Sequence, residues 1–483
     1  YTSGLNNMTP TRRGFLSLGA GAGFALGAAA AARPNILLIT ADDMNWDAPG
    51  CVGNRIPNIT PNIDRLAAQG MRFEHAHVTV AVCQPCRSVL MTGRYPHRNG
   101  AEGFQAIRED VPTLQEQLRG VGYLNGIFSK TEHLAPQSKF CWDYFKPAAE
   151  MGSGRDPSLY HRHTTEFLKQ AKAAGKPFFL MANSTDPHRP FAGSDQEAGR
   201  QEKKNKKADT RQPVRRTLTP AEVRVPGFLP DIPEVRREVA EYYTSVYRCD
   251  ETVGRVLQAL GESGLEQNTL VMFLSDNGMS FPYSKTNCYR DSTRTPWIVR
   301  WPGRVKPGVV ESRHMISGID FTPTVLEAGG IRQIPGTDGR SFVPVLEGRA
   351  QAGREQVVTV FHETSGRQRF EMRSIQTLRF GYLFNPWSDG KRIFRNESQN
   401  GRTFAAMREA AKTDARIAAR VDFFVKRVPE EFYDYQADPH ALNNLIGDPR
   451  HKPEIERLRR ELLQWMKRTG DPLATAFQEK IKV

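Results

Sequence analysis

The sequence predicts an α/β protein in which a parallel β-sheet is covered by helices on both faces. Short apolar runs at 33–40, 124–128, 178–182 and 269–274 each have the length and composition of a buried strand. Segments with helical spacing of apolar residues alternate with these runs, at 61–69, 113–119 and 158–174. Such alternation is typical of a sheet with helices on both sides. With 39% hydrophobic and 25% charged residues among 483, the composition is that of a folded protein.

The longest predicted helix begins near Asp231. Asp231 offers an N-cap carboxylate, Pro233 suits the first turn, and Glu234 adds negative charge near the helix N-terminus. Apolar side chains follow at helical spacing: Val239, Tyr242, Tyr243, Val246, Val256, Leu257 and Leu260. We interpret them as core residues rather than as a binding site.

The pattern changes after Gly348, where a second and smaller subdomain is expected to begin. Four further elements are predicted there: strands at 357–361 and 379–384, a charged helix at 403–426, and a final helix at 453–468. The change divides the chain into a large domain of residues 33–350 and a C-terminal subdomain of residues 351–483.

Residues 1–32 have the features of an N-terminal extension followed by a twin-arginine signal peptide. Arg12 and Arg13 precede an uncharged run rich in Gly and Ala, which ends in small residues before Arg33. A retained membrane anchor is the alternative, because the run approaches the length of a bilayer span, but Gly and Ala make it weakly apolar. We therefore expect cleavage, export by the twin-arginine machinery, and a mature protein that is periplasmic or secreted.

The formal net charge of +14 indicates attraction to polyanions, such as nucleic acid, anionic lipid or sulfated polysaccharide. The basic stretch from Arg200 to Arg216 has no aromatic residue that would stack on bases, so we interpret it as a solvated loop and expect no nucleic-acid partner. The six cysteines are too few and too scattered for a disulfide framework.

Acidic and amide side chains follow two of the predicted strands. Asp42 and Asp43 come directly after the first strand, and Asp276 and Asn277 follow the run at 269–274. Because the carboxyl ends of parallel strands meet at one edge of a sheet, these oxygen donors are expected to lie together, where they would suit Ca²⁺ or Mg²⁺. An Asp-Asp pair taken alone fits a turn or a helix cap equally well.

The segment from Cys83 to Arg94 strengthens the metal-site interpretation. Cys83, Pro85 and Arg87 form a C-x-P-x-R pattern, which is followed by Thr-Gly-Arg at 92–94. A redox pair of Cys83 with Cys86 and half of a zinc site are the alternatives. A redox pair has no use for Thr-Gly-Arg, and the sequence offers no second close ligand pair for zinc.

With these motifs in this order, the sequence resembles the type I sulfatases, over the chain from Arg33 almost to its end. The resemblance implies an alkaline-phosphatase-like fold, in which a large mixed, mostly parallel sheet forms the sulfatase catalytic domain (33–350) and a smaller antiparallel sheet with a helix forms the C-terminal subdomain. It also implies that a maturation enzyme converts Cys83 to formylglycine, whose hydrate is the nucleophile. The implied cofactor is Ca²⁺, with Mg²⁺ the second choice, bound by Asp42, Asp43, Cys83, Asp276 and Asn277.

The resemblance also places a set of cations and histidines around the sulfate group. The implied catalytic residues are Cys83, Arg87, Lys130, His133, His188 and Lys285, with His188 as general acid. The chain departs from the family twice: Lys130 and His133 are one residue further apart than in the family's K-x-H, and Lys285 stands where arginine also occurs. A looser match adds three substrate-binding residues, His362, Glu363 and Arg373. Taken singly, each of these residues also fits a helix cap, a turn or an ordinary surface position.

Segments 223–260 and 275–289 resemble the sulfamidase branch of the family, the N-sulfoglucosamine sulfohydrolases. This resemblance implies release of sulfate from N-sulfated glucosamine in heparan sulfate or heparin fragments. Three alternatives remain open: an O-sulfatase acting on another sulfated glycan, a phosphonate or phosphodiester hydrolase of the same fold, and a polyanion-binding protein whose cysteine is never modified.

Overall fold

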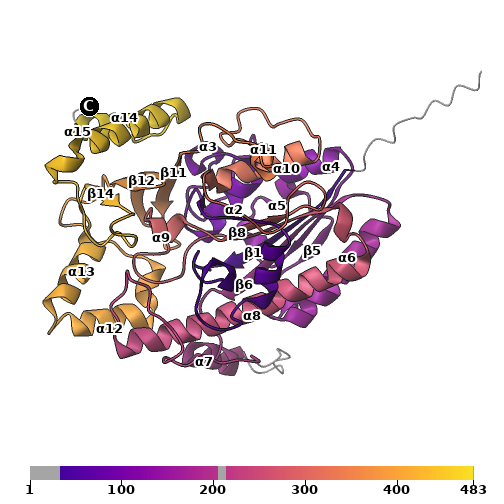
Figure 1. Cartoon of the computed structure of the whole chain (residues 1–483), viewed down its shortest axis with the longest axis horizontal. Helices are drawn as coiled ribbons and strands as arrows, with labels where there is room; N and C mark the ends of the chain where they lie inside the picture. Colours follow the sequence, from indigo (N-terminus) through magenta and orange to yellow (C-terminus); the bar gives the residue numbers. More distant parts are fainter. Residues whose placement is uncertain (1–32, 205–213, 482–483) are drawn as a thin grey trace, which may run out of the picture. The chain divides into compact units, whose positions relative to one another are not determined.

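The computed structural model describes residues 33–204 and 214–481. The extension and signal peptide predicted at 1–32 lie outside the described residues. The larger sheet has the strand order β5-β4-β6-β1-β7-β8-β2-β9 (Figure 1). Its strands are β1 (Asn35–Asp42), β2 (Met71–Phe73), β4 (Leu124–Phe128), β5 (Tyr144–Lys146), β6 (Phe178–Pro187), β7 (Thr269–Ser275), β8 (Trp297–Arg300) and β9 (Val309–Glu311).

The large sheet is mixed and mostly parallel, which confirms the predicted fold class. Strand β1 runs parallel to β6 on one side and to β7 on the other, with Ile39 opposite Ala182 and Phe273. Strand β8 runs antiparallel to both β7 and β2. All eight residues of β1 are buried, because helices cover both faces of the sheet.

The helices form two layers (Figure 1). On one side α1 (Pro61–Ala68), α6 (Pro157–Ala173) and α8 (Pro233–Ser263) pack together, and on the other α2 (Cys83–Thr92), α4 (Leu114–Gly120) and α10 (Phe321–Ala328). The short helices are α3 (Pro96–Asn99), α5 (Gln137–Phe140), α9 (Arg290–Thr293) and α11 (Val343–Leu346). Strands β3 (Ala76–His77) and β10 (Ile316–Ser317) form a separate parallel pair.

Helix α8 (Pro233–Ser263) begins one residue later than the predicted N-cap at Asp231 implies. Its N-cap is Ile232, and Asp231 instead accepts a 2.6 Å hydrogen bond from Arg236 Nη2. Of the predicted core residues, all are buried except Leu257, which is half-buried. Among the helices of the described ranges, none has the uninterrupted apolar length needed to cross a bilayer.

The smaller sheet is antiparallel, as predicted, and holds β11 (Gln356–Glu363), β12 (Arg369–Thr377), β13 (Phe380–Phe384) and β14 (Glu430–Asp434) in that order. Strands β12 and β14 were not foreseen. The single helix predicted at 403–426 is wrong: α12 (Arg402–Ala410) and α13 (Ala415–Lys426) are separate, because the Asp414 carboxylate caps the N-terminus of α13. Helices α14 (Lys452–Thr469) and α15 (Ala474–Ile481) follow. The division of the chain at residue 350 stays a prediction.

Helix α7 (Asp195–Lys204) corrects the loop predicted at 200–216. Residues 200–204 are helical, since Asp195 and Glu197 place negative charge in the first turn of this helix. Residues 205–213 lie outside the described ranges.

Glu238 of α8 joins the C-terminal subdomain to the large sheet. Its carboxylate accepts hydrogen bonds from the backbone N–H groups of Arg402 (3.1 Å) and Thr403 (2.7 Å), at the start of α12. The same carboxylate accepts a 2.9 Å hydrogen bond from Arg189 Nη2. One buried carboxylate therefore fixes both the first turn of α12 and the segment that follows β6.

Candidate active site

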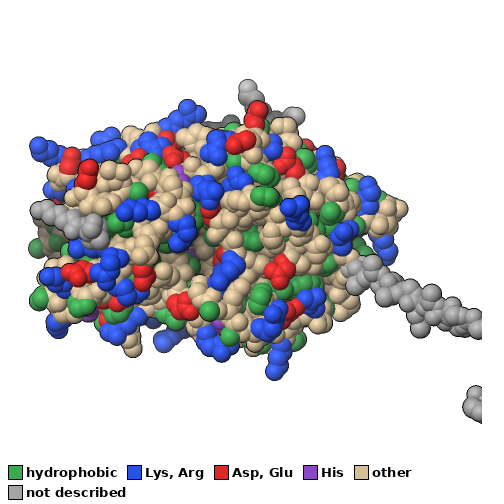
Figure 2. All heavy atoms as spheres, turned by 90° about the horizontal axis from the view of Figure 1, so that it is seen from above, with side chains coloured by type: hydrophobic (Ala, Val, Ile, Leu, Met, Phe, Trp, Pro, Cys, Tyr) green, Lys and Arg blue, Asp and Glu red, His purple; other side chains and the backbone are tan. Residues whose placement is uncertain are grey.

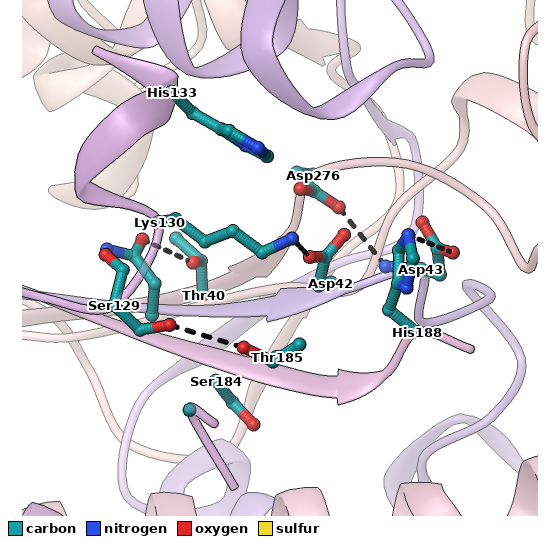
Figure 3. Close-up of polar contacts among 12 residues, drawn as sticks. Thr40, Asp42, Asp43, Ser129, Lys130, His133, Ser184, Thr185, His188 and Asp276 are labelled. Carbon is teal, nitrogen blue, oxygen red and sulfur yellow. Dashed lines mark hydrogen bonds and ion pairs between the residues drawn. The ribbon is translucent and has the colours of Figure 1, made fainter. Parts of the chain in front are cut away.

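The acidic residues predicted to meet at one edge of the large sheet do meet (Figure 3). Ala41 of β1 is paired with Ser275, the last residue of β7, so that the residues that follow them, Asp42 and Asp276, lie beside one another. The backbone N–H of Asp43 donates to Asp276 Oδ1 (3.1 Å), and Asn277 Nδ2 donates to Asp43 Oδ1 (2.7 Å). All four of these side chains are buried.

These oxygens fit a divalent cation. Asp42 Oδ1, Asp43 Oδ2 and Asn277 Oδ1 are buried and have no hydrogen-bond donor among the described residues. Asp42, Asp43 and His188 each offer a ligand atom, and these atoms lie within 4.8 Å of one another. Buried carboxylate oxygens without donors are costly, and a hard cation with oxygen ligands compensates that cost.

The charge balance at this edge also favours a cation. Burial and the charge of Asp42 raise the pKa of Asp276 to about 7. Burial likewise raises the pKa of Asp43 to about 6, despite the nearby Lys285 ammonium. For Asp42, the cations around it, with Lys130 first, outweigh burial and hold its pKa well below the usual range. Burial therefore makes the negative charges of Asp43 and Asp276 costly, and a bound cation would offset that cost.

Cys83 is the first residue of α2, and its side chain is buried. The free N–H groups of the first helical turn make this an electropositive position that suits an anion. Burial raises the pKa of Cys83 to about 12, and it raises the pKa of Cys86 well above the usual range. Because thiolates and not thiols are reactive, two protonated buried thiols disfavour the alternative of a redox pair.

Arg87 lies one helical turn after Cys83 and is fully buried. Its Nη2 donates to Asp276 Oδ2 (2.6 Å), and its Nη1 donates to Thr40 Oγ1 (2.9 Å) and Asn183 Oδ1 (2.5 Å). Thr40 and Asn183 face one another across β1 and β6. The sequence analysis missed both residues, although a polar side chain inside each apolar strand was the available signal.

Lys130 and His133 follow β4 and point toward the acidic residues (Figure 3). Ser129 and Lys130 both adopt left-handed backbone conformations, with φ of 55° and 52°, and the Lys130 ammonium pairs with Asp42. Residues 131–133 form a turn of 3₁₀ helix, in which residues three apart lie on one side. This turn accommodates the additional residue between Lys130 and His133. Burial and the charge of Lys130 lower the pKa of His133 to about 2, so its imidazole is neutral.

His188 follows β6 and presents its Nε2 atom to the site. Its Nδ1 donates to the Arg189 carbonyl (2.5 Å), and its Nε2 lies 3.9 Å from Asp43 Oδ2. Asp186 binds Arg155 (2.9 Å) and Arg248 (2.6 Å), and Arg155 also donates to the His188 carbonyl (2.7 Å). Burial and the Lys285 charge lower the pKa of His188 to about 3.

Lys285 is fully buried, with Nζ 2.8 Å from Asp43 Oδ1. It also forms an ion pair with Glu397, which comes from the C-terminal subdomain. Glu397 was missed, because no recognisable motif surrounds it in the sequence. A cavity of about 520 Å³ opens beside these residues, and it is lined by His188, Arg189, Gln196, Gly199, Ser280, Glu397 and Asn400.

The three residues predicted to bind substrate have different surroundings. Arg373 is fully buried and donates to both carboxylate oxygens of Asp471 (2.6 and 3.2 Å). His362 is also fully buried, with Nδ1 3.6 Å from Glu102 Oε1. Arg373 and His362 are therefore buried beside acidic residues of the protein itself, and their assignment to substrate binding stays a prediction. Glu363 accepts a 2.7 Å hydrogen bond from Gln105.

Comparison with known proteins agrees with this site. The Sulfatase family model matches residues 34–331, and the chain belongs to the sulfatase family, which makes it a hydrolase. A second family model, the C-terminal region of N-sulphoglucosamine sulphohydrolase, matches residues 280–386.

Individual proteins extend this comparison. The chain is 32% identical to N-sulphoglucosamine sulphohydrolase of Homo sapiens over 481 residues, which cover 92% of each chain. It is 27% identical to an ulvan-active sulfatase of Formosa agariphila, covering 92% of this chain and 82% of the relative. A structure solved with its substrate D-glucosamine-2-N,6-O-disulfate has a TM-score of 0.68 and 20% identity over 91% of this chain and 99% of that chain. The fold is therefore the alkaline-phosphatase-like fold of the sulfatases.

Proposed function

We propose that this protein releases sulfate from N-sulfated glucosamine at the end of heparan sulfate or heparin fragments. The observation that carries the proposal is the set of charged groups around Cys83. Two cations and two carboxylates act on its side chain: Lys285, Lys130, Asp42 and Asp276. A nucleophile between cations and a divalent-metal site suits an anionic sulfuryl group. The preference for N-sulfate is supported by the similarity to N-sulphoglucosamine sulphohydrolase, including its C-terminal region.

In this proposal Asp42, Asp43, Asp276 and Asn277, with Cys83, hold Ca²⁺, which would polarise a sulfate oxygen. Converted to formylglycine and hydrated, Cys83 would supply one hydroxyl that attacks sulfur and a second that lets sulfate leave. Arg87 is held rigidly by its three acceptors, so its positive charge favours an ionised hydroxyl at residue 83. Lys130 binds a sulfate oxygen, and His133 receives the proton of the second hydroxyl because its imidazole is neutral.

His188 protonates the departing nitrogen. Its Nδ1 proton is committed to the Arg189 carbonyl, so Nε2 is the atom that takes up and transfers a proton. Binding of an anionic sulfamate nearby favours the protonated form of this imidazole. Lys285, paired with Glu397, holds positive charge on the same side of the site.

The signal predicted at 1–32 supports export, with the protein acting in the periplasm or outside the cell.

The proposal is tested by sulfate release from matched monosaccharides at saturating calcium. N-sulfoglucosamine should release inorganic sulfate, whereas glucosamine 6-O-sulfate should release little. Mass spectrometry of the Cys83 peptide, from protein made in its native host, should show formylglycine. The opposite substrate preference would retain the sulfatase and reject the sulfamidase, and an unmodified thiol in active protein would reject the nucleophile.

An O-sulfatase is the second candidate. The ulvan-active relative and the structure bound to a sugar with both N- and 6-O-sulfate favour it, and His188 and Lys285 would serve either leaving group. The same monosaccharide comparison decides between the two. Hydrolysis of phosphonate or phosphodiester substrates is tested by incubating the same protein with those substrates in place of the sulfated sugars. Polyanion binding without turnover of any substrate would indicate a binding protein.

A further inference from the structure

Four arginine side chains line an open depression of about 680 Å³ beside the C-terminal sheet. Arg367 and Arg369 come from the turn and strand that follow β11, and Arg392 and Arg395 come from the segment after β13. The face of the protein drawn in Figure 2 carries basic side chains interleaved with acidic ones. The described residues that line the depression include these four arginines and no acidic side chain, so the lining differs from that mixed pattern.

Two of the four are fixed by the protein itself. Arg369 pairs with Glu102 and with Glu371, each at 2.7 Å. Arg392 stacks over the Phe370 ring, with Cζ 4.7 Å from the ring centroid, and donates to the Arg369 carbonyl. These contacts connect the two segments and hold their positive charges close together.

Arg367 and Arg395 have no comparable use in the fold. Both are exposed, and within the described ranges neither guanidinium has a hydrogen-bond or ion-pair partner. Like charges held near one another repel, and an anion bound between them removes that repulsion. The planar fork of a guanidinium matches the oxygens of a carboxylate or a sulfate group.

The segment at residues 102–105 connects this depression with the catalytic site. At one end Glu102 pairs with Arg369. In the middle the Phe104 ring lies edge-on to His133, with centroids 5.9 Å apart. At the other end the Gln105 carbonyl accepts a 2.8 Å hydrogen bond from Gln84, the residue after Cys83.

A second and independent connection runs through Glu397. This residue pairs with Lys285 in the catalytic site, and Arg395 precedes it by only two positions. Because a residue spans at most about 3.6 Å of extended chain, the Cα atoms of Arg395 and Glu397 lie within about 7 Å of one another. Two short segments, residues 102–105 and 395–397, therefore each connect the depression with the catalytic site.

We infer that the arginine depression, formed by Arg367, Arg369, Arg392 and Arg395, binds a second anionic group of the same glycan whose terminal sulfamate occupies the catalytic site. The inference rests on the proposed function and extends it from a single sugar to a chain. The anionic group is a carboxylate or an O-sulfate on a sugar following the terminal one. Binding there holds the chain while its last sugar reacts, so it favours oligosaccharides over monosaccharides.

The double variant Arg367→Gln/Arg395→Gln tests this inference, because it removes the two arginines without a structural contact and leaves Arg369 and Arg392 in place. We compare kcat/KM for N-sulfoglucosamine with kcat/KM for a tetrasaccharide that ends in it. The ratio of the tetrasaccharide value to the monosaccharide value should fall about tenfold in the double variant, mostly through KM. In the parent, added salt should lower the tetrasaccharide value more than the monosaccharide value.

The matched control is Lys169→Gln/Lys176→Gln, which removes two exposed positive charges. Lys176 lies shortly before the first residue of β6, at the edge of the sheet opposite the catalytic site, so the ratio should equal that of the parent. Two tetrasaccharides, with and without O-sulfates on the inner sugars, distinguish the two anions. A larger loss with the O-sulfated chain assigns the site to sulfate, and equal losses assign it to carboxylate.

A second measurement separates this inference from the proposed function. Calorimetric titration with a heparin tetrasaccharide that lacks N-sulfate needs no turnover, and the double variant should bind it about tenfold more weakly than the parent and the control. An unchanged affinity together with an unchanged substrate ratio would overturn the inference. Absence of N-sulfate release from every substrate, with the affinity loss still observed, would overturn the proposed function and leave the anion site standing.

Discussion

Two buried clusters of charged residues in this protein use their oxygens differently. In the C-terminal sheet, both oxygens of Glu431 are saturated: Arg427 and Asn385 donate to Oε1, each at 2.8 Å, and Tyr289 and Tyr433 donate to Oε2 at 2.9 and 2.6 Å. The Glu431 carboxylate therefore has no oxygen left for a ligand. Its donors come from separate elements, so it stabilises the packing of the C-terminal sheet against the large sheet.

The cluster at the edge of the large sheet has the opposite character. Asp42 Oδ1, Asp43 Oδ2 and Asn277 Oδ1 have no donor among the described residues, although all three are buried. The backbone is unusual here too, since Asp43 and Lys130 adopt φ of 71° and 52°. Unsatisfied oxygens and strained backbone together are typical of a site built for a ligand rather than for stability.

The largest expected effect is a loss of enzyme activity when the nucleophile beside the large-sheet cluster is removed. Cys83→Ala should lower kcat by at least about a thousandfold, because it removes the nucleophile. The side chain is small and makes no hydrogen bond to the described residues, so the urea midpoint should stay near that of the parent. Cys86→Ser is the matched control, since the C-x-P-x-R pattern leaves this position open, and it should retain activity. Full activity of Cys83→Ala, or loss of all activity in Cys86→Ser, would contradict the assignment.

The next comparison exchanges one carboxylate in each cluster for its amide. Asp43→Asn should weaken Ca²⁺ binding at least about tenfold, measured by calorimetry, because it removes a charge from an oxygen-ligand site. Glu431→Gln should leave Ca²⁺ affinity unchanged but lower the free energy of unfolding by about 3 kcal/mol, since it breaks a buried pair with Arg427.

The control for this pair is unfolding in the presence of a chelator. Without calcium, Asp43→Asn should lose less stability than Glu431→Gln, because burial raises the pKa of Asp43 to about 6 and its charge is therefore costly when no cation is bound. If both variants lost calcium affinity equally, or both lost stability equally, the distinction between a ligand site and a structural cluster would be wrong.

What the sequence could predict depends on whether the residues that act together are contiguous in the chain. Motifs such as Cys83 to Arg87 and Asp42-Asp43 are contiguous, so the sequence alone can show their resemblance to a known family, and that resemblance implies the chemistry. Strand and helix periods similarly predicted the large sheet. Arg373 and His362 could not be judged in this way, because only the tertiary fold shows that Asp471 and Glu102 already occupy their surroundings.

Residues that act across long sequence distances were missed for the same physical reason. Glu397 reaches Lys285 from another subdomain, and Asn183 orients Arg87 across the sheet. Glu397 has no local pattern that differs from an ordinary loop, and a polar residue inside an apolar strand, as at Asn183, does not show which distant side chain it meets. The split between α12 and α13 depends on a single cap at Asp414, and hydrophobic periodicity does not register a cap.

The smallest expected effect concerns a buried histidine outside both clusters. His77 in β3 is buried, with its Nδ1 3.1 Å from Thr293 Oγ1. Burial, with the charges of Arg294 and Arg290, holds the pKa of His77 well below its usual value, so folded His77 stays neutral while the unfolded chain takes up a proton below about pH 6.5. The stabilisation is therefore complete above that pH and is lost as the pH falls, by about 1.4 kcal/mol per pH unit.

In calcium-saturated protein, His77→Asn should reduce the slope of unfolding free energy against pH between pH 6.5 and 5 by that amount. Equal slopes for the parent and His77→Asn would show that His77 is not a structural neutral histidine.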